Sequence, residues 1–457
     1  MKNKLYIILI LALAISSCTN YLSVKPQGKV IPETDEEFAS LIHNQINKIE
    51  GGEDMLVIGN FETILLNESF SDNFDANVKI GNIPAYAGDK INTKQYNYKG
   101  YFEIIRDCNI VIENIGDRET ELAKKTCAAA YALKGICYYN LIREYCPPYD
   151  KTASEQLGIP IIDRFDMEEM PARASLKNTI DYTEQLLLKS ISYNINDKFF
   201  LINSDAAKAY LAKLYFWTSN WTSTIKLCQE LLENKAYKLA SIAEYEQVMQ
   251  AKNAWGQEII IRSHINNNSD IDWYYVTFIK DLKTRPVNAT LVKLFDRDKE
   301  NDVRYSMSFD KKRLNQKNLS AKVRGSELVL MLAESYYHNN LPDKALEQLN
   351  YLRRNRIKNV SDYTLASLED IDNTQIIKTD VNGKALSKLL NAIFIERRKE
   401  LYAEGDRWFE LKRNGRPEMW IINNGLKYTT KQYLYTAPIY KGDIDLNKNL
   451  IQNEGYK

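Results

Sequence analysis

Apolar residues recur at helical spacing through several long stretches of the chain. Between Leu122 and Tyr145 they are separated by three or four residues, and small residues keep the other faces of this stretch thin. The pattern predicts a helix that a neighbouring helix can approach closely. Cys146 and the two prolines that follow it predict its end, because proline cannot continue the helical hydrogen bonds.

Two further helical stretches each break once, at a short polar turn. One covers residues 205–232 and breaks at residues 219–220, and the other covers residues 327–352 and breaks at residues 339–342. Pro342 suits the first turn of a helix, where its missing N–H costs nothing. Each stretch therefore predicts two helices joined by a tight turn, close to the period of tetratricopeptide repeats, about 34 residues.

A fourth helical pattern, over residues 389–411, is dense in charge. We expect one continuous helix in which Arg397 and Glu400 pair at a spacing of three residues, with Trp408 and Phe409 packed inward. Paired carboxylates can hydrolyse glycosides. Because these acids alternate with arginines on one predicted helix, an ion-pair lattice that stabilises helix packing is the better interpretation.

Long, less regular segments separate the helical units, so the chain is not a plain solenoid. They cover chiefly residues 71–100, 236–322 and 357–385, and they are rich in Asn, Asp, Lys, Tyr and Gly. Segments of this length in a compact domain are usually functional. We therefore expect a helical scaffold that carries functional insertions.

The N-terminus resembles a bacterial lipoprotein signal. A positively charged start precedes an apolar run from Leu5 to Ile15, which is shorter than the ~20 residues of a membrane-spanning helix, and Cys18 follows two serines. We expect residues 1–17 to be a signal peptide and Cys18 to be lipidated, with residues 18–30 as a tether to one domain over residues 18–457. The alternative is a secretory signal cut elsewhere, with Cys18 incidental.

Composition narrows the class of protein. Removing residues 1–17 takes away Lys2 and Lys4 and leaves 59 basic against 60 acidic residues, without a basic stripe that would bind nucleic acid. Tyrosine is abundant, with 30 residues, and its broad apolar face and polar tip suit carbohydrate-like or peptide-like ligands.

The usual signatures of a metal site or an enzyme are missing from the sequence. It has no Cys-x-x-Cys, no Gly-x-Ser-x-Gly, no glycine-rich phosphate loop and only three histidines, so we expect no metal, no cofactor and no catalytic residues. Buried, inert thiols are the better interpretation of the cysteines. Acidic and amide residues near the C-terminus match calcium-loop positions, but Lys448 stands where such a loop needs glycine.

Motifs of one protein family appear at both ends of the mature chain. After Cys18, residues 21–26 (Tyr-Leu-Ser-Val-Lys-Pro) are similar to an opening of an aromatic residue or Leu, then Leu, Asp, a hydrophobic residue and Pro, although Ser23 replaces the Asp. Residues 324–334 resemble an Arg-x-Ala-Glu helix that ends in Ala-Glu, and residues 437–456 are similar to the family's C-terminal tail.

The charged run carries the most specific motif. Residues 396–411 resemble Glu-Arg-Arg-x-Glu-Leu-x-x-Glu-Gly-x-Arg-x-x-Asp-Leu, with Glu410 in place of the Asp. Together these motifs identify the chain as a member of the SusD-like (RagB/SusD) family of outer-membrane lipoproteins of Bacteroidetes. The resemblance covers the whole mature chain.

The resemblance implies a mostly α-helical, SusD-like fold with four tetratricopeptide-like helix pairs as scaffold and long irregular insertions as binding face. It implies a lipid-anchored protein of the outer membrane that faces the cell exterior. As partners it implies a SusC-like TonB-dependent transporter and an oligosaccharide or peptide ligand, which the protein captures for import.

The family's ligand contacts tend to come from the segments before the first repeat helix and before the Arg-x-Ala-Glu helix. Sugar rings stack on aromatic side chains, while their hydroxyls need polar partners. The corresponding candidates here are Tyr86, Tyr96, Tyr98, Trp255, Trp273, Tyr274 and Tyr275, with Asp72, Asn73 and Asn77. A repeat scaffold that assembles envelope proteins without a small ligand is the alternative function, and an envelope hydrolase is a weaker one.

Overall fold

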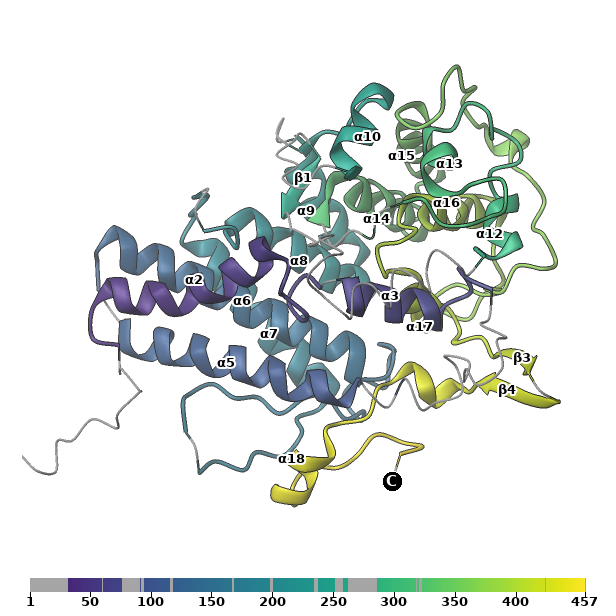
Figure 1. Cartoon of the computed structure of the whole chain (residues 1–457). Coiled ribbons are helices and arrows are strands. Elements are labelled where there is room, and N and C mark those ends of the chain that lie inside the picture. The colour runs from purple at the N-terminus through teal and green to yellow at the C-terminus, as the bar shows by residue number, and fades with distance from the viewer. Residues whose placement is uncertain are drawn as a thin grey trace, which may run out of the picture.

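The computed structural model describes most of the chain (Figure 1), namely residues 32–59, 61–75, 91, 94–115, 118–166, 168–197, 200–233, 237–250, 258–261, 286–317, 319, 323–423 and 425–456. The fold is mostly helical, as predicted, and the described residues also form two small sheets. None of the described helices combines the length and hydropathy that a bilayer crossing demands.

The helices of the N-terminal half are α2 (Asp35–Gly51), α3 (Phe61–Phe70), α5 (Gln95–Ile115), α6 (Glu121–Tyr145), α7 (Leu176–Ser192), α8 (Ser204–Trp217) and α9 (Trp221–Glu233). The inserted region that follows holds α10 (Ile242–Gln250), β1 (Ile259–Ile261), α12 (Ala289–Lys293), α13 (Val303–Ser308) and β2 (Val323–Arg324).

The C-terminal part holds α14 (Gly325–His338), α15 (Pro342–Arg354), η3 (Leu365–Ser367), α16 (Lys388–Glu400), α17 (Arg407–Arg413), β3 (Met419–Asn423), β4 (Leu426–Thr430), η4 (Gln432–Tyr435) and α18 (Lys441–Leu446). Strands β1 and β2 pair antiparallel, and β3 and β4 form an antiparallel hairpin.

The scaffold is a row of helices in which each packs on the next. The order is α5, α6, α7, α8, α9, α14 and α15, and α16 packs on both α14 and α15. Because α9 packs directly on α14, the inserted region between them leaves the row and returns to it without interrupting the stacking. The predicted helix pairs α8–α9 and α14–α15 are confirmed, and Pro342 begins α15 as expected.

Helix α6 packs against α2, α5, α7 and α8. The hydroxyl of Thr120 caps its first turn by accepting from the Ala123 N–H at 3.1 Å, and the helix ends before Cys146. A Cβ on Gly135 would lie 2.7 Å from a methyl carbon of Leu187 on α7. The predicted close approach of a neighbouring helix is therefore confirmed, and a glycine is what allows it.

The charged run is not one helix, so that prediction is wrong. Helix α16 ends at Glu400, the chain turns through Ala403 and Gly405 with positive φ angles of 64° and 77°, and α17 begins at Arg407. Glu396 pairs with Lys399 within α16 and Arg407 pairs with Glu410 within α17, but most charges of the run pair between elements. Arg397, for example, donates to Asp406 at 2.7 Å instead of pairing with Glu400.

The aromatic pair of α17 and the cysteines behave as predicted. Trp408 and Phe409 are buried, and Trp408 stacks on Tyr435 with ring centroids 4.3 Å apart. The structure describes five cysteines, each buried and without a disulfide, and these are Cys108, Cys127, Cys137, Cys146 and Cys228. Burial raises the pKa of the Cys146 thiol to about 11, which keeps it inert.

Candidate functional site

The two segments that were predicted to supply ligand contacts meet in the fold. Phe74 pairs with Val287 in an antiparallel bridge, the Asp75 N–H donates to the Pro286 carbonyl at 2.9 Å, and the Asn288 N–H donates to the Asn73 carbonyl at 2.8 Å. We call these residues, 73–75 and 286–288, the junction. Residues 76–90 and 262–285, which adjoin the junction in the sequence, lie outside the described residues.

Asp72 braces the junction through two arginines. Its carboxylate accepts from Arg407 Nε at 2.7 Å and lies 3.1 Å from Arg398 Nη2, while its backbone carbonyl accepts from Arg398 at 2.6 Å. Burial alone would raise the pKa of Asp72, but the two guanidinium groups outweigh it and lower the pKa to about 2. The carboxylate therefore stays ionised and paired with Arg398 and Arg407.

Asn73 is equally committed to partners inside the protein. Its amide oxygen accepts from Arg398 Nε at 3.0 Å, and its amide nitrogen donates to Glu68 at 2.7 Å. Glu68 also accepts from the Gly405 N–H at 2.9 Å. Burial raises the pKa of Glu68 to about 7, against the lowering effect of these two hydrogen bonds. The side chains of Asp72 and Asn73 thus stabilise the junction, because their polar groups bind other side chains of the protein.

The two described aromatic candidates have opposite surroundings. Tyr96 and Tyr98 both lie in the first turn of α5. Tyr96 is 64% exposed beside Tyr440, with centroids 5.9 Å apart, whereas Tyr98 is 1% exposed and packs on Phe102 and Tyr145. Of the two, only Tyr96 presents a ring to solvent.

The other candidates cannot be placed by the structure. Tyr86, Asn77, Trp255, Trp273, Tyr274, Tyr275 and the lipidation residue Cys18 lie outside the described residues.

A buried network of ion pairs includes the C-terminal residues of α16. Its cations are Arg304, Lys317, Arg324, Arg356 and Lys399, and its carboxylates are Glu258, Asp302, Glu396, Glu400 and Glu404. None of these side chains is more than 6% exposed. Equal numbers of both signs explain how so many charges are tolerated out of water.

The network joins the inserted region to the scaffold. Glu258, beside β1, accepts from Arg324 at 2.6 Å and from Arg356 at 3.0 Å, and both arginines also bind Glu400 on α16. Burial would raise the pKa of Glu396, but Arg304 and Lys399 lower it to about 2. A general acid must hold a proton near the working pH, so Glu396 is an ion-pair partner rather than a proton donor.

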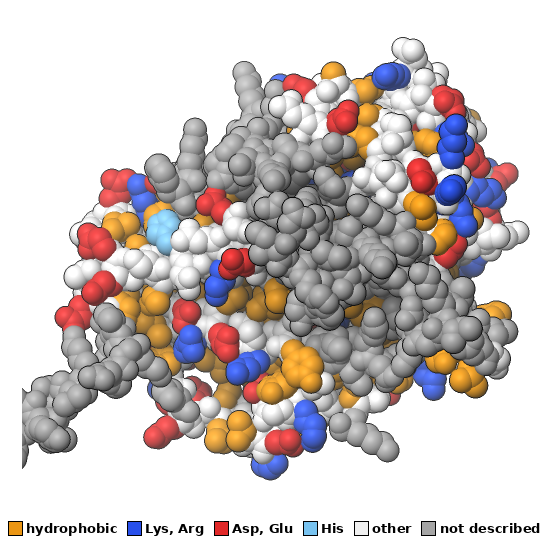
Figure 2. Space-filling model, viewed as in Figure 1, with side chains coloured by type: hydrophobic (Ala, Val, Ile, Leu, Met, Phe, Trp, Pro, Cys, Tyr) orange, Lys and Arg blue, Asp and Glu red, His pale blue; other side chains and the backbone are white. Residues whose placement is uncertain are grey.

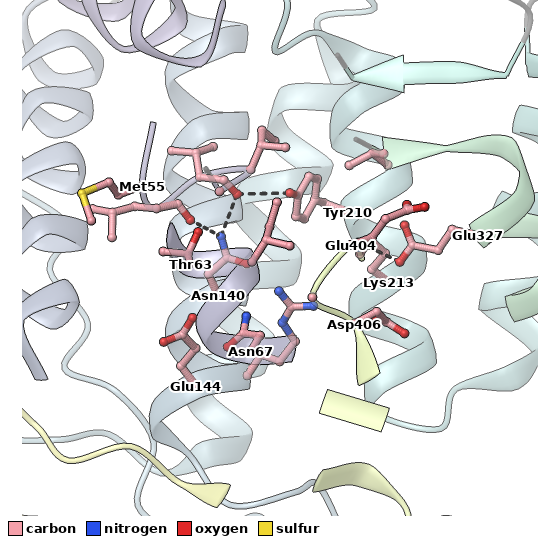
Figure 3. A pocket seen from close by; sticks show the side chains of 18 of the residues that line it. Met55, Thr63, Asn67, Asn140, Glu144, Tyr210, Lys213, Glu327, Glu404 and Asp406 are labelled. Carbon is pink, nitrogen blue, oxygen red and sulfur yellow. Dashed lines mark hydrogen bonds and ion pairs between the residues drawn. The ribbon is translucent and has the colours of Figure 1, made fainter. Parts of the chain in front are cut away.

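A polar cavity of about 80 Å³ lies between residues 55–59, α3, α6, α8 and residues 401–406 (Figure 3). Asn140 donates to the carbonyls of Leu56 and Val57 at 3.0 and 2.9 Å, and Lys213 pairs with Glu327 at 2.8 Å. The cavity has room for a few water molecules, each of which occupies roughly 30 Å³, and is well below the size of a ligand pocket. It belongs to the packing of the scaffold.

The C-terminal residues that match calcium-loop positions have other roles here. The side-chain amides of Asn447 and Asn449 donate to the carbonyls of Pro171 and Met170 at 2.9 and 2.8 Å, and Asp445 pairs with Lys441. Within the described ranges, no three His, Cys, Asp or Glu side chains gather as metal ligands would.

Sequence reasoning named Asp72 and Asn73 but missed Phe74, Val287 and Arg398, which form or support the junction with them. Phe74 and Val287 carry no motif, and their pairing depends on segments more than 200 positions apart. Arg398 does lie in the recognisable charged run, so a signal was present there. Its partners, however, come from the other end of the chain.

Comparison with known proteins agrees with this architecture. Residues 237–456 match the family described as "SusD family", and residues 20–216 match the family described as "Starch-binding associating with outer membrane". No curated protein matches the sequence significantly.

Solved structures with a similar fold include a SusD superfamily protein from Bacteroides thetaiotaomicron, with a TM-score of 0.70, 18% identity, and coverage of 92% of this chain and 99% of that one. A protein from Bacteroides vulgatus described as a putative sugar binding protein has a TM-score of 0.69 and 21% identity, over 94% of this chain and 100% of that one. A structure described as a laminarin binding SusD-like protein has a TM-score of 0.62 and 16% identity, over 92% and 99%.

Proposed function

This chain belongs to the SusD family, and from that premise we propose that it is a glycan-binding lipoprotein of the outer-membrane surface. In this proposal it captures an oligosaccharide and passes it to a SusC-like TonB-dependent transporter. Lipidated Cys18 holds it at the membrane, because acyl chains contribute about 0.8 kcal/mol per buried CH₂ group. The names of similar structures, a sugar-binding and a laminarin-binding protein, support a carbohydrate as ligand class.

The observation that carries the proposal is the pairing of Phe74 with Val287. It joins residue 74, from which the chain continues to Asn77 and Tyr86, to residue 287, which follows the segment that contains Trp273, Tyr274 and Tyr275. In the proposal, aromatic and polar candidates of these two segments contact one ligand. A glycan needs both kinds of group at once, since its C–H faces stack while its hydroxyls form hydrogen bonds.

Binding rather than hydrolysis is the proposed activity. Several buried carboxylates of the described residues, among them Asp72, Glu396 and Glu400, are each held by arginines. Glycoside hydrolysis needs two carboxyl groups that face the scissile bond, one of them able to donate a proton. The committed roles of these carboxylates support a binding protein.

The test is a glycan array followed by calorimetry on the best ligand. We expect micromolar to millimolar binding, which corresponds to about 4–8 kcal/mol. Trp273→Ala and Tyr96→Ala should each weaken it about tenfold, the size of one lost stacking contact. The matched control is Phe165→Ala, because Phe165 is also an exposed aromatic residue, at 44%.

If both variants bind like the parent protein, the site lies elsewhere, and Trp255 and Tyr86 become the next candidates. Saturable binding to proteins but to no glycan would favour the repeat-scaffold function instead. Release of reducing ends from the bound glycan would contradict the assignment as a binding protein.

A further inference from the structure

The β3–β4 hairpin projects from the scaffold at one edge of the molecule. Figure 1 shows it beyond α17, away from the row of helices, and its strands pack mainly on each other among the described elements. Its turn contains Gly425, whose φ of 75° suits a glycine. No described atom lies within 4 Å of the position that a Cβ would take there. The tip of the hairpin is therefore open to solvent.

Two large apolar side chains of the hairpin are exposed. Trp420 on β3 is 56% exposed, and Leu426 at the start of β4 is 60% exposed. Figure 2 shows hydrophobic side chains at the surface along the same edge of the molecule. Because both belong to one projecting element, they can leave water together when the hairpin meets an apolar surface.

The hairpin is basic, whereas the mature chain as a whole is not. Residues 415–431 contain Arg416, Lys427 and Lys431 against one acid, Glu418, while the mature chain has 59 basic and 60 acidic residues. None of the three cations forms an ion pair with a described carboxylate. The hairpin thus presents positive charge that no acid of the described chain neutralises.

Lys427 lies beside an aromatic ring instead of an acid. Its Nζ is 5.0 Å from the centroid of the Trp420 indole ring. The strand register agrees, because Trp420 pairs with Thr429, two positions from Lys427, so both side chains lie on the same face of the hairpin. Segments that bind a membrane surface combine tryptophan at the level of the head groups with lysines that reach the phosphates.

A lipid surface fits this hairpin better than a protein partner does. Stable protein interfaces bury about 800 Å² on each partner and have few charges at their centre. The hairpin offers two apolar side chains and three unpaired cations. Anionic head groups attract such cations, with about a fivefold gain in affinity for each. A contact of this size is weak alone, but a tether to the membrane raises the effective concentration of the hairpin there.

We propose that the tip of the β3–β4 hairpin binds the anionic head-group region of the bilayer that anchors the protein. Trp420 and Leu426 enter the head-group region, while Lys427 and Lys431 face lipid phosphates. The contact adds to the lipid anchor at Cys18 and orients the scaffold on the membrane. The inference rests on the proposed outer-membrane location and goes beyond it, because it assigns a second membrane contact to described residues.

The test uses the whole mature chain with Cys18→Ser, which removes the lipid and leaves the hairpin intact. Flotation measures its binding to vesicles of phosphatidylethanolamine and phosphatidylglycerol, with vesicles of phosphatidylcholine alone for comparison. We expect weak binding, at millimolar lipid, that is at least about fivefold tighter for the anionic vesicles and falls as salt is added. Binding this weak is compatible with release of the same variant from cell membranes during fractionation.

Substitutions in the hairpin separate its two contributions. Trp420→Ser should weaken binding to the anionic vesicles about tenfold, and Lys427→Gln and Lys431→Gln should each weaken it about fivefold. The matched controls are Phe165→Ser, at another exposed aromatic residue, and Lys151→Gln, at another exposed lysine. Both controls should bind like the parent chain. Because all five positions are exposed or at the edge of the fold, the variants should stay folded.

A fluorescent probe reports the contact directly. Leu426→Cys carries a polarity-sensitive dye in the Cys18→Ser chain, where the other five cysteines are buried. Its emission should shift to the blue when anionic vesicles are added. The same dye at Leu188→Cys, on an exposed position of α7, should not shift.

Three results would overturn the proposal. These are equal binding to anionic and neutral vesicles, binding by Trp420→Ser as tight as that of the parent chain, and unchanged emission from the dye at position 426. Hairpin variants that lose affinity for the purified SusC-like transporter but not for vesicles would also overturn it, in favour of a protein partner.

Failure of this proposal is distinguishable from failure of glycan capture. Vesicle binding needs no glycan, and Trp420→Ser should keep the parent protein's affinity for the best ligand from the glycan array. Vesicle binding without glycan binding would therefore contradict only the proposed ligand, and the reverse would contradict only the membrane contact of the hairpin.

Discussion

Arg324 and Glu400, which lie in two separate sequence motifs, form a buried ion pair with 2.6 Å between Nη1 and Oε1. Neither side chain is exposed to solvent. Arg324 ends β2 and immediately precedes α14, whereas Glu400 ends α16, so the pair fastens the entry of one scaffold helix to the exit of another. The same arginine reaches Glu258 and Glu404. The two motifs therefore meet in one buried cluster of ion pairs around Arg324.

Arg324→Met should lower the free energy of unfolding by about 3–5 kcal/mol, because it leaves Glu258, Glu400 and Glu404 with a missing counter-charge. Urea denaturation followed by circular dichroism measures the loss. The control is Arg118→Met, since the pair of Arg118 with Asp35 is partly exposed and should contribute less than about 1 kcal/mol. Equal losses for the two variants would contradict the stabilising role of the buried ion pairs of Arg324.

Asp72→Asn should loosen the junction as well as the fold. It removes the countercharge that Arg398 and Arg407 share, and we expect a loss of about 2–4 kcal/mol. The local readout is amide hydrogen exchange at Asp75 and Asn288, whose N–H groups close the junction, with Leu133 in α6 as internal reference. Exchange at the two junction amides should accelerate more than at Leu133. An equal acceleration at all three would show a purely global effect.

Much of the scaffold could be predicted from local sequence. The helix pair α14–α15 follows from a spacing of three to four residues, a polar break and a proline that suits a first helical turn. These signals lie within one or two turns of the residues they specify. Helix α6 could be predicted for the same reason, including the thin face at Gly135.

Contacts between residues far apart in the sequence determine the features that could not be predicted. The pattern over residues 389–411 continues through Glu404, but Glu404 leaves the helix to meet Arg324, 80 positions earlier. Tyr96 and Tyr98 looked equivalent as loop residues, yet they lie in α5, and only Tyr98 faces the core. The partner of Phe74 is likewise set by tertiary pairing, for which the sequence carries no local signal.

Cys18→Ser should release the protein from membranes. The prediction rests on the position of Cys18 directly after the short apolar run, and it is tested by fractionating cells that lack the SusC-like partner. The parent protein should sediment with the outer membrane and the variant should stay soluble. Cys228→Ser is the control, because this buried thiol should have no part in anchoring. A Cys18→Ser variant that still sediments would contradict lipid anchoring.

Glu68 should make the protein less stable as the pH rises through neutrality. It is fully buried, and burial raises its pKa from an ordinary 4.5 to about 7. Between these two values the folded state keeps the proton while the unfolded state has lost it. The folded state therefore binds more protons, and the free energy of unfolding falls as the pH increases through this window.

The expected loss between pH 4.5 and pH 8 is about 3 kcal/mol, from a pKa difference of about 2.5 units at 1.36 kcal/mol each. Urea denaturation at half-unit pH steps measures it in the parent protein and in Glu68→Gln, which cannot ionise. The difference in unfolding free energy between the two should change by that amount across the window, whatever the absolute stability of the variant. Glu246→Gln, at an exposed position on α10, is the control and should leave the pH profile unchanged. A pH profile of Glu68→Gln that runs parallel to that of the parent protein would show that Glu68 does not titrate in this range.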